Sequence, residues 1–145
     1  MDVQTYLFFN GRCDEAVEFY RRAIGAKPGQ LFRFKDAPDQ SMITPGSRDK
    51  VMHGSFTVGE TEILVSDGRE GSKLHFEGFS LALRPGAAEA DKMFASLGEG
   101  GKVDMPLSKT FFAEKFGMLT DKFGVSWMII ARSPHPAYPA SPNPP

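Results

Sequence analysis

The stretch that decides the fold covers residues 3–25 and reads VQTYLFFNGRCDEAVEFYRRAIG. Its first part, residues 3–9, is rich in β-branched and aromatic side chains and ends at Asn10-Gly11, which predicts a strand. From about residue 14 to residue 24 apolar side chains recur at helical spacing, with acidic residues at the start and basic residues at the end. Gly25 supplies a stop signal for this helix.

The rest of the chain repeats this order of elements. Three predicted strands follow the helix, and the last two flank Gly59-Glu60, a turn of hairpin length. A second strand, helix and three strands then come in the same order, which indicates an old duplication. The predicted strands after the first helix lie at about 30–35, 52–58, 61–66, 76–83, 102–107, 115–120 and 125–131, and the second helix lies at 87–97.

We therefore expect an α+β protein in which residues 1–131 form one domain of two tandem βαβββ modules, at about 1–67 and 74–131. Each helix can cover only one face of its sheet, so the concave face stays open. Two such faces side by side form a curved mixed sheet with a central cleft. The tail, residues 132–145, is rich in proline and is expected to be disordered or loosely draped.

Composition excludes several classes of function. Seventeen basic and eighteen acidic residues give a net charge of −1, so no basic field favours a nucleic-acid partner. One cysteine and three histidines argue against a disulfide framework or a cysteine- or histidine-rich metal cluster. The first residues lack the pattern of a signal peptide, and the apolar run 127–131 is too short to span a membrane. We expect a cytoplasmic protein without a membrane partner.

His53 is the most interesting ionisable residue. It lies on a predicted strand with Ser55 and Thr57 on the same face, a polar surface that suits a general base or a hydrogen-bonding group for a substrate. A structural histidine bonded to backbone is the alternative. His75 is expected at the surface, and His135 lies in the tail.

Other residues divide between structure and function. Cys13 is expected to be a helix-entry residue rather than a nucleophile, and Trp127 a core residue if Met128 faces the cleft. Phe111 and its neighbour Phe112 could close over a ligand or form a dimer contact. Glu114 could pair with Lys115 or face the cleft as an acid or base.

Four segments resemble PhnB-like proteins of the glyoxalase/bleomycin-resistance (vicinal oxygen chelate) superfamily. They read YLFFNG at 6–11, DEAVEFY at 14–20, VMHGSF at 51–56 and EKFGMLTDKFGVSWMI at 114–129. The resemblance covers about residues 3–131 and implies the paired βαβββ fold and a homodimer. Some members are described as 3-demethylubiquinone methyltransferases. The glycine clusters at 68–71 and 98–101 do not support that activity, because neither has the strand, glycine, helix order of a nucleotide-type cofactor site.

The resemblance also places the superfamily's metal ligands on four positions of this chain. These read Thr5, Ile63, Ser80 and Met128, and none supplies an imidazole or a carboxylate. We therefore expect no metal and no other cofactor. A displaced divalent-metal site remains the alternative, and it needs at least two of His53, Glu62 and Glu114 to converge.

The sequence thus predicts a protein that binds a small organic molecule in a mainly apolar, metal-free cleft, with catalysis left open. His53 would be the polar anchor or base. The expected wall residues are Thr5, Leu7, Ser55, Ile63, Ser80, Phe111, Glu114 and Met128. The alternatives are a metal-dependent lyase, isomerase or dioxygenase, and a non-enzymatic protein that sequesters an antibiotic-like molecule.

Overall fold

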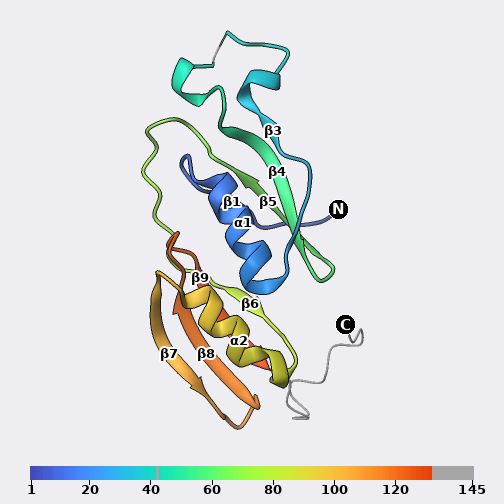
Figure 1. Ribbon diagram of the computed structural model, residues 1–145, viewed down its shortest axis with the longest axis vertical. Helices are drawn as coiled ribbons and strands as arrows, with labels where there is room; N and C mark the ends of the chain where they lie inside the picture. Colours follow the sequence, from blue (N-terminus) through green and yellow to red (C-terminus); the bar gives the residue numbers. More distant parts are fainter. Residues whose placement is uncertain (42, 132–145) are drawn as a thin grey trace. The chain divides into compact units, whose positions relative to one another are not determined.

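The structure, a computed structural model, describes residues 1–41 and 43–131. The chain divides into two units, Met1–Leu74 (unit 1) and His75–Pro145 (unit 2). Each unit has one mixed sheet and one α-helix (Figure 1), so the fold class is α+β as expected. The tail at 132–145, with His135, lies outside the described residues.

Unit 1 forms a five-stranded sheet in the order β1-β5-β4-β2, and β3 also pairs with β4. The first strand runs parallel to the last strand of the unit, β5, whereas β4 is antiparallel to its partners. The elements are β1 (Tyr6–Phe8), α1 (Cys13–Ile24), β2 (Lys27–Pro28), β3 (Phe32–Arg33), the 3₁₀ turns η1 (Phe34–Asp36) and η2 (Pro45–Ser47), β4 (Val51–Val58) and β5 (Thr61–Ser66).

Helix α1 forms where the sequence predicts it, and it covers one face of this sheet (Figure 1). Acidic residues occupy its first turn and basic residues its last, which complements the helix dipole. Gly25 adopts the left-handed conformation (φ 68°) and donates its N–H to Arg21 O, so the helix ends there. The buried ring of Tyr20 packs between Phe9 and Phe56, with ring centroids 6.2 and 5.2 Å away. This face of the sheet is the core of unit 1.

Unit 2 has the same plan with fewer interruptions. Its four-stranded sheet has the order β6-β9-β8-β7, and its first strand again runs parallel to its last. The elements are β6 (Leu81–Leu83), α2 (Ala87–Gly98), β7 (Lys102–Ser108), β8 (Lys115–Thr120) and β9 (Ser126–Ala131).

The core of unit 2 lies between α2 and this sheet. Leu97, Leu119 and Ile129 are fully buried there. Gly117 sits so close to α2 that an added Cβ would meet the Phe94 ring at 2.8 Å. Trp127 is buried and donates its Nε1–H to Asp121 Oδ2 at 2.9 Å, which confirms the predicted core role.

The predicted strand lengths are wrong at three places. The first strand of each unit has three residues instead of seven or eight, because it pairs only with the three matching residues of β5 or β9. Residues 30–35 form only the short β3 followed by η1, and the two-residue strand β2 was not predicted. Within the described residues, no helix is long and apolar enough to cross a membrane.

Candidate functional site

The face of the unit 1 sheet opposite α1 carries a row of partly exposed side chains, which we call the open face. Register places Tyr6 beside Leu64 and Leu64 beside Ser55, so these three side chains share that face. Tyr6 and Phe8 are 38% and 41% exposed. The members of the open face are Gln4, Tyr6, Phe8, His53, Ser55, Thr57, Glu62 and Leu64.

The geometry of the open face centres on a hydrogen bond between Tyr6 and His53. The Tyr6 hydroxyl lies 3.0 Å from His53 Nδ1, and the two ring centroids are 5.9 Å apart. Since β5 lies between β1 and β4, the phenol reaches across a whole strand to meet the imidazole. Phe8 stacks on Tyr6, with centroids 4.9 Å apart and ring planes at 16°. The result is a small aromatic platform with an imidazole at its edge.

The Tyr6 hydroxyl keeps its proton. Burial raises the pKa of Tyr6, and the polar Ser66 side chain opposes that shift without reversing it. Ser66 is itself buried, and its Oγ accepts the N–H of Gly68 at 2.9 Å. The Ser66 side chain thus ties the end of β5 to the loop that follows it.

Glu62 also lies on the open face, where the side-chain amide of Gln4 donates to its Oε1 at 3.0 Å. Its neighbour along the strand, Ile63, points to the opposite face and is buried. On β5 it is therefore Glu62, one residue before the expected position Ile63, that faces the open side of the sheet.

Two expected wall residues, Leu7 and Ile63, lie on the helix-covered face of the sheet and not on the open face. Leu7 is 0% and Ile63 5% exposed, and both lie in the core beneath α1. Thr5 shares the alternation of Leu7 and is half-buried, with its carbonyl bonded to the N–H of Leu64. The physical reason is that β1 is apolar on both faces, so alternation cannot tell which side chains go inwards.

In unit 2 the expected residues Ser80 and Met128 lie on the sheet face opposite α2. Ala82, Met128 and Met118 are register partners and form an apolar row there. Ser80 Oγ lies 2.6 Å from Ser126 Oγ, so each hydroxyl has a partner within the unit.

The loop before β8 carries the other two expected residues. Phe111 is 81% exposed and contacts Phe112 edge-on, while Phe112 packs in turn against Phe116. Glu114 is exposed, and Lys115 pairs with Asp91 rather than with Glu114.

Cys13 and His75 are structural or surface residues, in line with the sequence. Cys13 is fully buried, and burial, with the nearby carboxylates of Asp67 and Asp14, raises the pKa of its thiol to about 12. A thiol that stays protonated is a poor nucleophile. His75 pairs with Glu77 at 2.9 Å on the surface.

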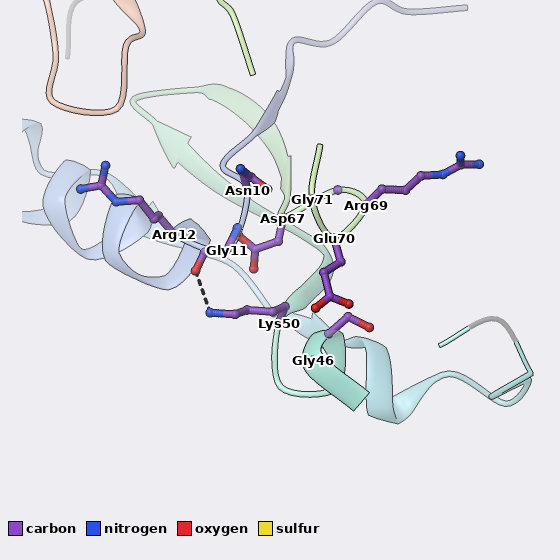
Figure 2. A pocket seen from close by; sticks show the side chains of 11 residues that line it. Asn10, Gly11, Arg12, Gly46, Lys50, Asp67, Arg69, Glu70 and Gly71 are labelled. Carbon is purple, nitrogen blue, oxygen red and sulfur yellow. Dashed lines mark hydrogen bonds between the residues drawn. The ribbon is translucent and has the colours of Figure 1, made fainter. Parts of the chain in front are cut away.

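Unit 1 also contains a polar pocket of about 340 Å³ that the sequence did not predict (Figure 2). It lies between the β1–α1 loop, η2 and the loop after β5. Its lining residues are Asn10, Gly11, Arg12, Gly46, Ser47, Lys50, Asp67, Gly68, Arg69, Glu70 and Gly71.

Three charged residues of this pocket, Asp67, Lys50 and Glu70, bind groups of its own walls. Asp67 accepts the N–H groups of Gly11, Cys13 and Val51, each at 2.8 Å. Lys50 Nζ donates to Gly11 O at 3.0 Å, the contact drawn as a dashed line in Figure 2. The Thr44 hydroxyl donates to the Glu70 carboxylate. The pocket is therefore best understood as a junction that fixes the start of α1.

The residues at the four expected ligand positions do not fit the divalent metal of the superfamily. Of the four expected ligand positions, Ile63 is buried and apolar, and Thr5, Ser80 and Met128 offer weak donors. His53 Nδ1 is engaged by Tyr6 and the Glu62 carboxylate by Gln4. In residues 1–41 and 43–131 no three His, Cys, Asp or Glu side chains are grouped so that they could hold an ion.

The two units, each with one mixed sheet and one helix, have the fold of the glyoxalase/bleomycin-resistance superfamily. Residues 1–130 match the family described as 3-demethylubiquinone-9 3-methyltransferase, and the chain belongs to this PhnB-related family. It is 33% identical over 138 residues to protein YjdN of Escherichia coli strain K12, which covers 89% of this chain and 94% of that protein.

Solved structures support this assignment. Protein PA1353 from Pseudomonas aeruginosa is 36% identical with a TM-score of 0.80, over 91% of this chain and 98% of that one. The PhnB protein from Bacillus cereus is 28% identical with a TM-score of 0.74, over 91% and 100%. The fosfomycin resistance protein FosX from Listeria monocytogenes is 10% identical with a TM-score of 0.61, over 92% and 91%, which shows a shared fold alone.

Proposed function

We propose that this protein binds a small organic molecule on the open face of unit 1, without a resident metal ion. His53 is the polar anchor for the ligand, and the stacked rings of Tyr6 and Phe8 form the apolar wall beside it. Ser55 and Leu64 extend the same surface. Ser80 and Met128 remain candidate ligand contacts on the sheet of unit 2.

The observation that carries this proposal is the Tyr6–His53 hydrogen bond on an exposed aromatic surface. Large aromatic side chains are normally buried, and an exposed pair next to an oriented imidazole is the arrangement expected where a flat ligand is bound. The pocket at the start of α1 is the weaker candidate, because Asp67 and Lys50 are hydrogen-bonded to its own walls.

The two glycine clusters do not suit the cofactor of a methyltransferase. The glycines at 98–101 follow α2 and precede β7, and those at 68–71 follow β5 with β6 as the next regular element. Neither cluster lies between a strand and the N-terminus of a helix, where a nucleotide-type cofactor is held.

Whether the ligand is transformed or only held separates an enzyme from a sequestering protein. Incubation of the purified protein with a panel of small aromatic ketones, quinones and phenols, followed by mass spectrometry, distinguishes the two. Product formation that is lost in His53→Ala supports catalysis with His53 as base. Saturable binding without product supports sequestration, and the absence of binding across the panel contradicts the proposal.

The metal-dependent alternative is tested by elemental analysis of the purified full chain. We expect no stoichiometric divalent metal. About one tightly held Zn²⁺, Ni²⁺ or Fe²⁺ per chain would instead support a lyase, isomerase or dioxygenase with a displaced site that uses His53 and Glu62 or Glu114.

We also propose that the protein is a homodimer in solution, as is usual for the superfamily it belongs to. Phe111 is the exposed aromatic side chain most suited to such a contact. Light scattering coupled to gel filtration gives the mass directly, and a monomer at micromolar concentration would contradict this part of the proposal.

A further inference from the structure

We infer that Tyr6 is a positioning residue that holds His53 in the tautomer with its proton on Nε2, so that the site presents an N–H donor to a neutral carbonyl ligand. This inference rests on the proposed function of the open face. It adds the role of Tyr6, which the sequence did not single out, and the chemistry of the ligand.

The direction of the Tyr6–His53 hydrogen bond follows from the groups around the phenol. The phenol has one proton to donate, and within residues 1–41 and 43–131 its hydroxyl is hydrogen-bonded to His53 Nδ1 alone. A protonated phenol 3.0 Å from His53 Nδ1 therefore donates to that nitrogen. In a neutral imidazole the nitrogen that accepts carries no proton, so the proton is on Nε2.

His53 Nε2 is available for a ligand. His53 is exposed, and within residues 1–41 and 43–131 its ring makes a hydrogen bond only to Tyr6. An N–H donor requires an acceptor on the ligand, and an oxygen is the usual one.

The remaining groups of the open face restrict the body of the ligand. The stacked rings of Tyr6 and Phe8 offer a flat apolar surface on one side of His53. The carboxylate of Glu62 on the same face disfavours an anionic ligand. The structure therefore favours a neutral, planar compound with a carbonyl oxygen at its edge.

The tautomer is tested directly by long-range ¹H–¹⁵N spectra of the full-length protein labelled in histidine, at a pH where the imidazole is neutral. His53→Gln assigns the signals among the three histidines. We expect a proton on Nε2 only in the wild-type protein, and a shift toward the averaged signals of free histidine in Tyr6→Phe. Phe79→Leu, a control at an exposed phenylalanine of unit 2, should leave the signals unchanged. A proton on Nδ1 in the wild type, or an unchanged spectrum in Tyr6→Phe, would overturn the inference.

The ligand chemistry is tested with two probes of the same shape, 2-acetylnaphthalene and 2-isopropenylnaphthalene, in which CH₂ replaces the carbonyl oxygen. We expect the ketone to bind about five- to tenfold more tightly, the usual value of one hydrogen bond. The ratio should fall to about one in His53→Ala and to an intermediate value in Tyr6→Phe. Equal binding of both probes to the wild type would overturn the inference and leave the proposed function standing. If neither probe binds, the proposed function fails as well.

Discussion

The two units have the same order of elements but differ in the chemistry of their open sheet faces. In unit 1 the row of register partners opposite the helix is Tyr6, Leu64 and Ser55, and in unit 2 the corresponding row is Ala82, Met128 and Met118. One row leads to an oriented imidazole, and the other is apolar throughout. A repeated backbone plan therefore does not imply a repeated set of side chains on the exposed face of the sheet.

The units are alike in how they fix their turns. Each has one buried aspartate just after a strand that accepts three N–H groups. Asp67 accepts N–H groups from residues 11, 13 and 51, which are distant in the sequence, whereas the donors to Asp121 lie at most six positions after it. We therefore expect the loss of Asp67 to lower the free energy of unfolding more than the loss of Asp121.

The largest effect is expected for Asp67→Asn. An amide cannot accept from Gly11, Cys13 and Val51 as a carboxylate does, and its NH₂ group opposes one of these donors. We expect a loss of about 3 kcal/mol in the free energy of unfolding, and about 2 kcal/mol for Asp121→Asn. Urea titration measures both. Asp49→Asn, at an exposed carboxylate, should stay within about 0.5 kcal/mol. An Asp121→Asn loss greater than that of Asp67→Asn would break the comparison.

A pH-dependent effect is expected from Cys13, which has no counterpart in unit 2. Because burial raises the pKa of its thiol to about 12, the unfolded chain loses this proton near pH 9 while the folded chain keeps it. The folded state thus binds more protons between these values, and stability falls as the pH rises. Relative to wild type, Cys13→Ala should gain about 1–3 kcal/mol between pH 9 and pH 11. Parallel pH profiles of the two proteins would show instead that the thiol ionises freely.

A smaller loss of stability is expected when alanine replaces a glycine that lets a strand lie close to neighbouring residues. A Cβ at Gly117 would meet the Phe94 ring at 2.8 Å and Met105 O at 3.1 Å, inside the packed core of unit 2. A Cβ at Gly54 would meet Leu31 Cδ2 at 2.4 Å and Gln30 O at 3.2 Å, but the Leu31 side chain is partly exposed and can move. We expect Gly117→Ala to cost about 1–2 kcal/mol and Gly54→Ala less than about 1 kcal/mol. Thermal unfolding ranks the two variants, and the reverse order would contradict the packing described for unit 2.

The smallest effect is expected for Phe111→Ser. This side chain is 81% exposed, so its removal should change the free energy of unfolding of the folded chain by less than about 0.5 kcal/mol. Its effect on association is the informative part. If Phe111 lies in a dimer contact, the variant should dissociate at a higher protein concentration in sedimentation experiments. An unchanged dissociation constant would assign Phe111 to the surface of the protomer.

The fold was largely predictable because its signals are local. Helical spacing, the charges at the ends of α1, and the glycines at 25 and 59 define elements from neighbouring residues alone. The same reasoning singles out His53 as a candidate, since Ser55 and Thr57 mark its strand face as polar.

The partner of His53 could not be predicted in this way. Tyr6 meets it only through the pairing of β1 with β5 and of β5 with β4, which is long-range information. The predicted orientation of Leu7 and Ile63 is wrong because, in a strand with apolar residues on both faces, alternation does not show which side chains point inwards. Glu62 was the available signal, because a charged residue on β5 implies that Ile63 points inwards.

The central claim, that the functional surface belongs to unit 1, is tested most directly by calorimetric titration of 2-acetylnaphthalene into His53→Ala and Ser80→Ala. The two variants remove one polar group from the open face of each unit. We predict about five- to tenfold weaker binding for His53→Ala and a change below about twofold for Ser80→Ala. Unchanged binding in His53→Ala together with a large loss in Ser80→Ala would contradict the claim and move the site to unit 2.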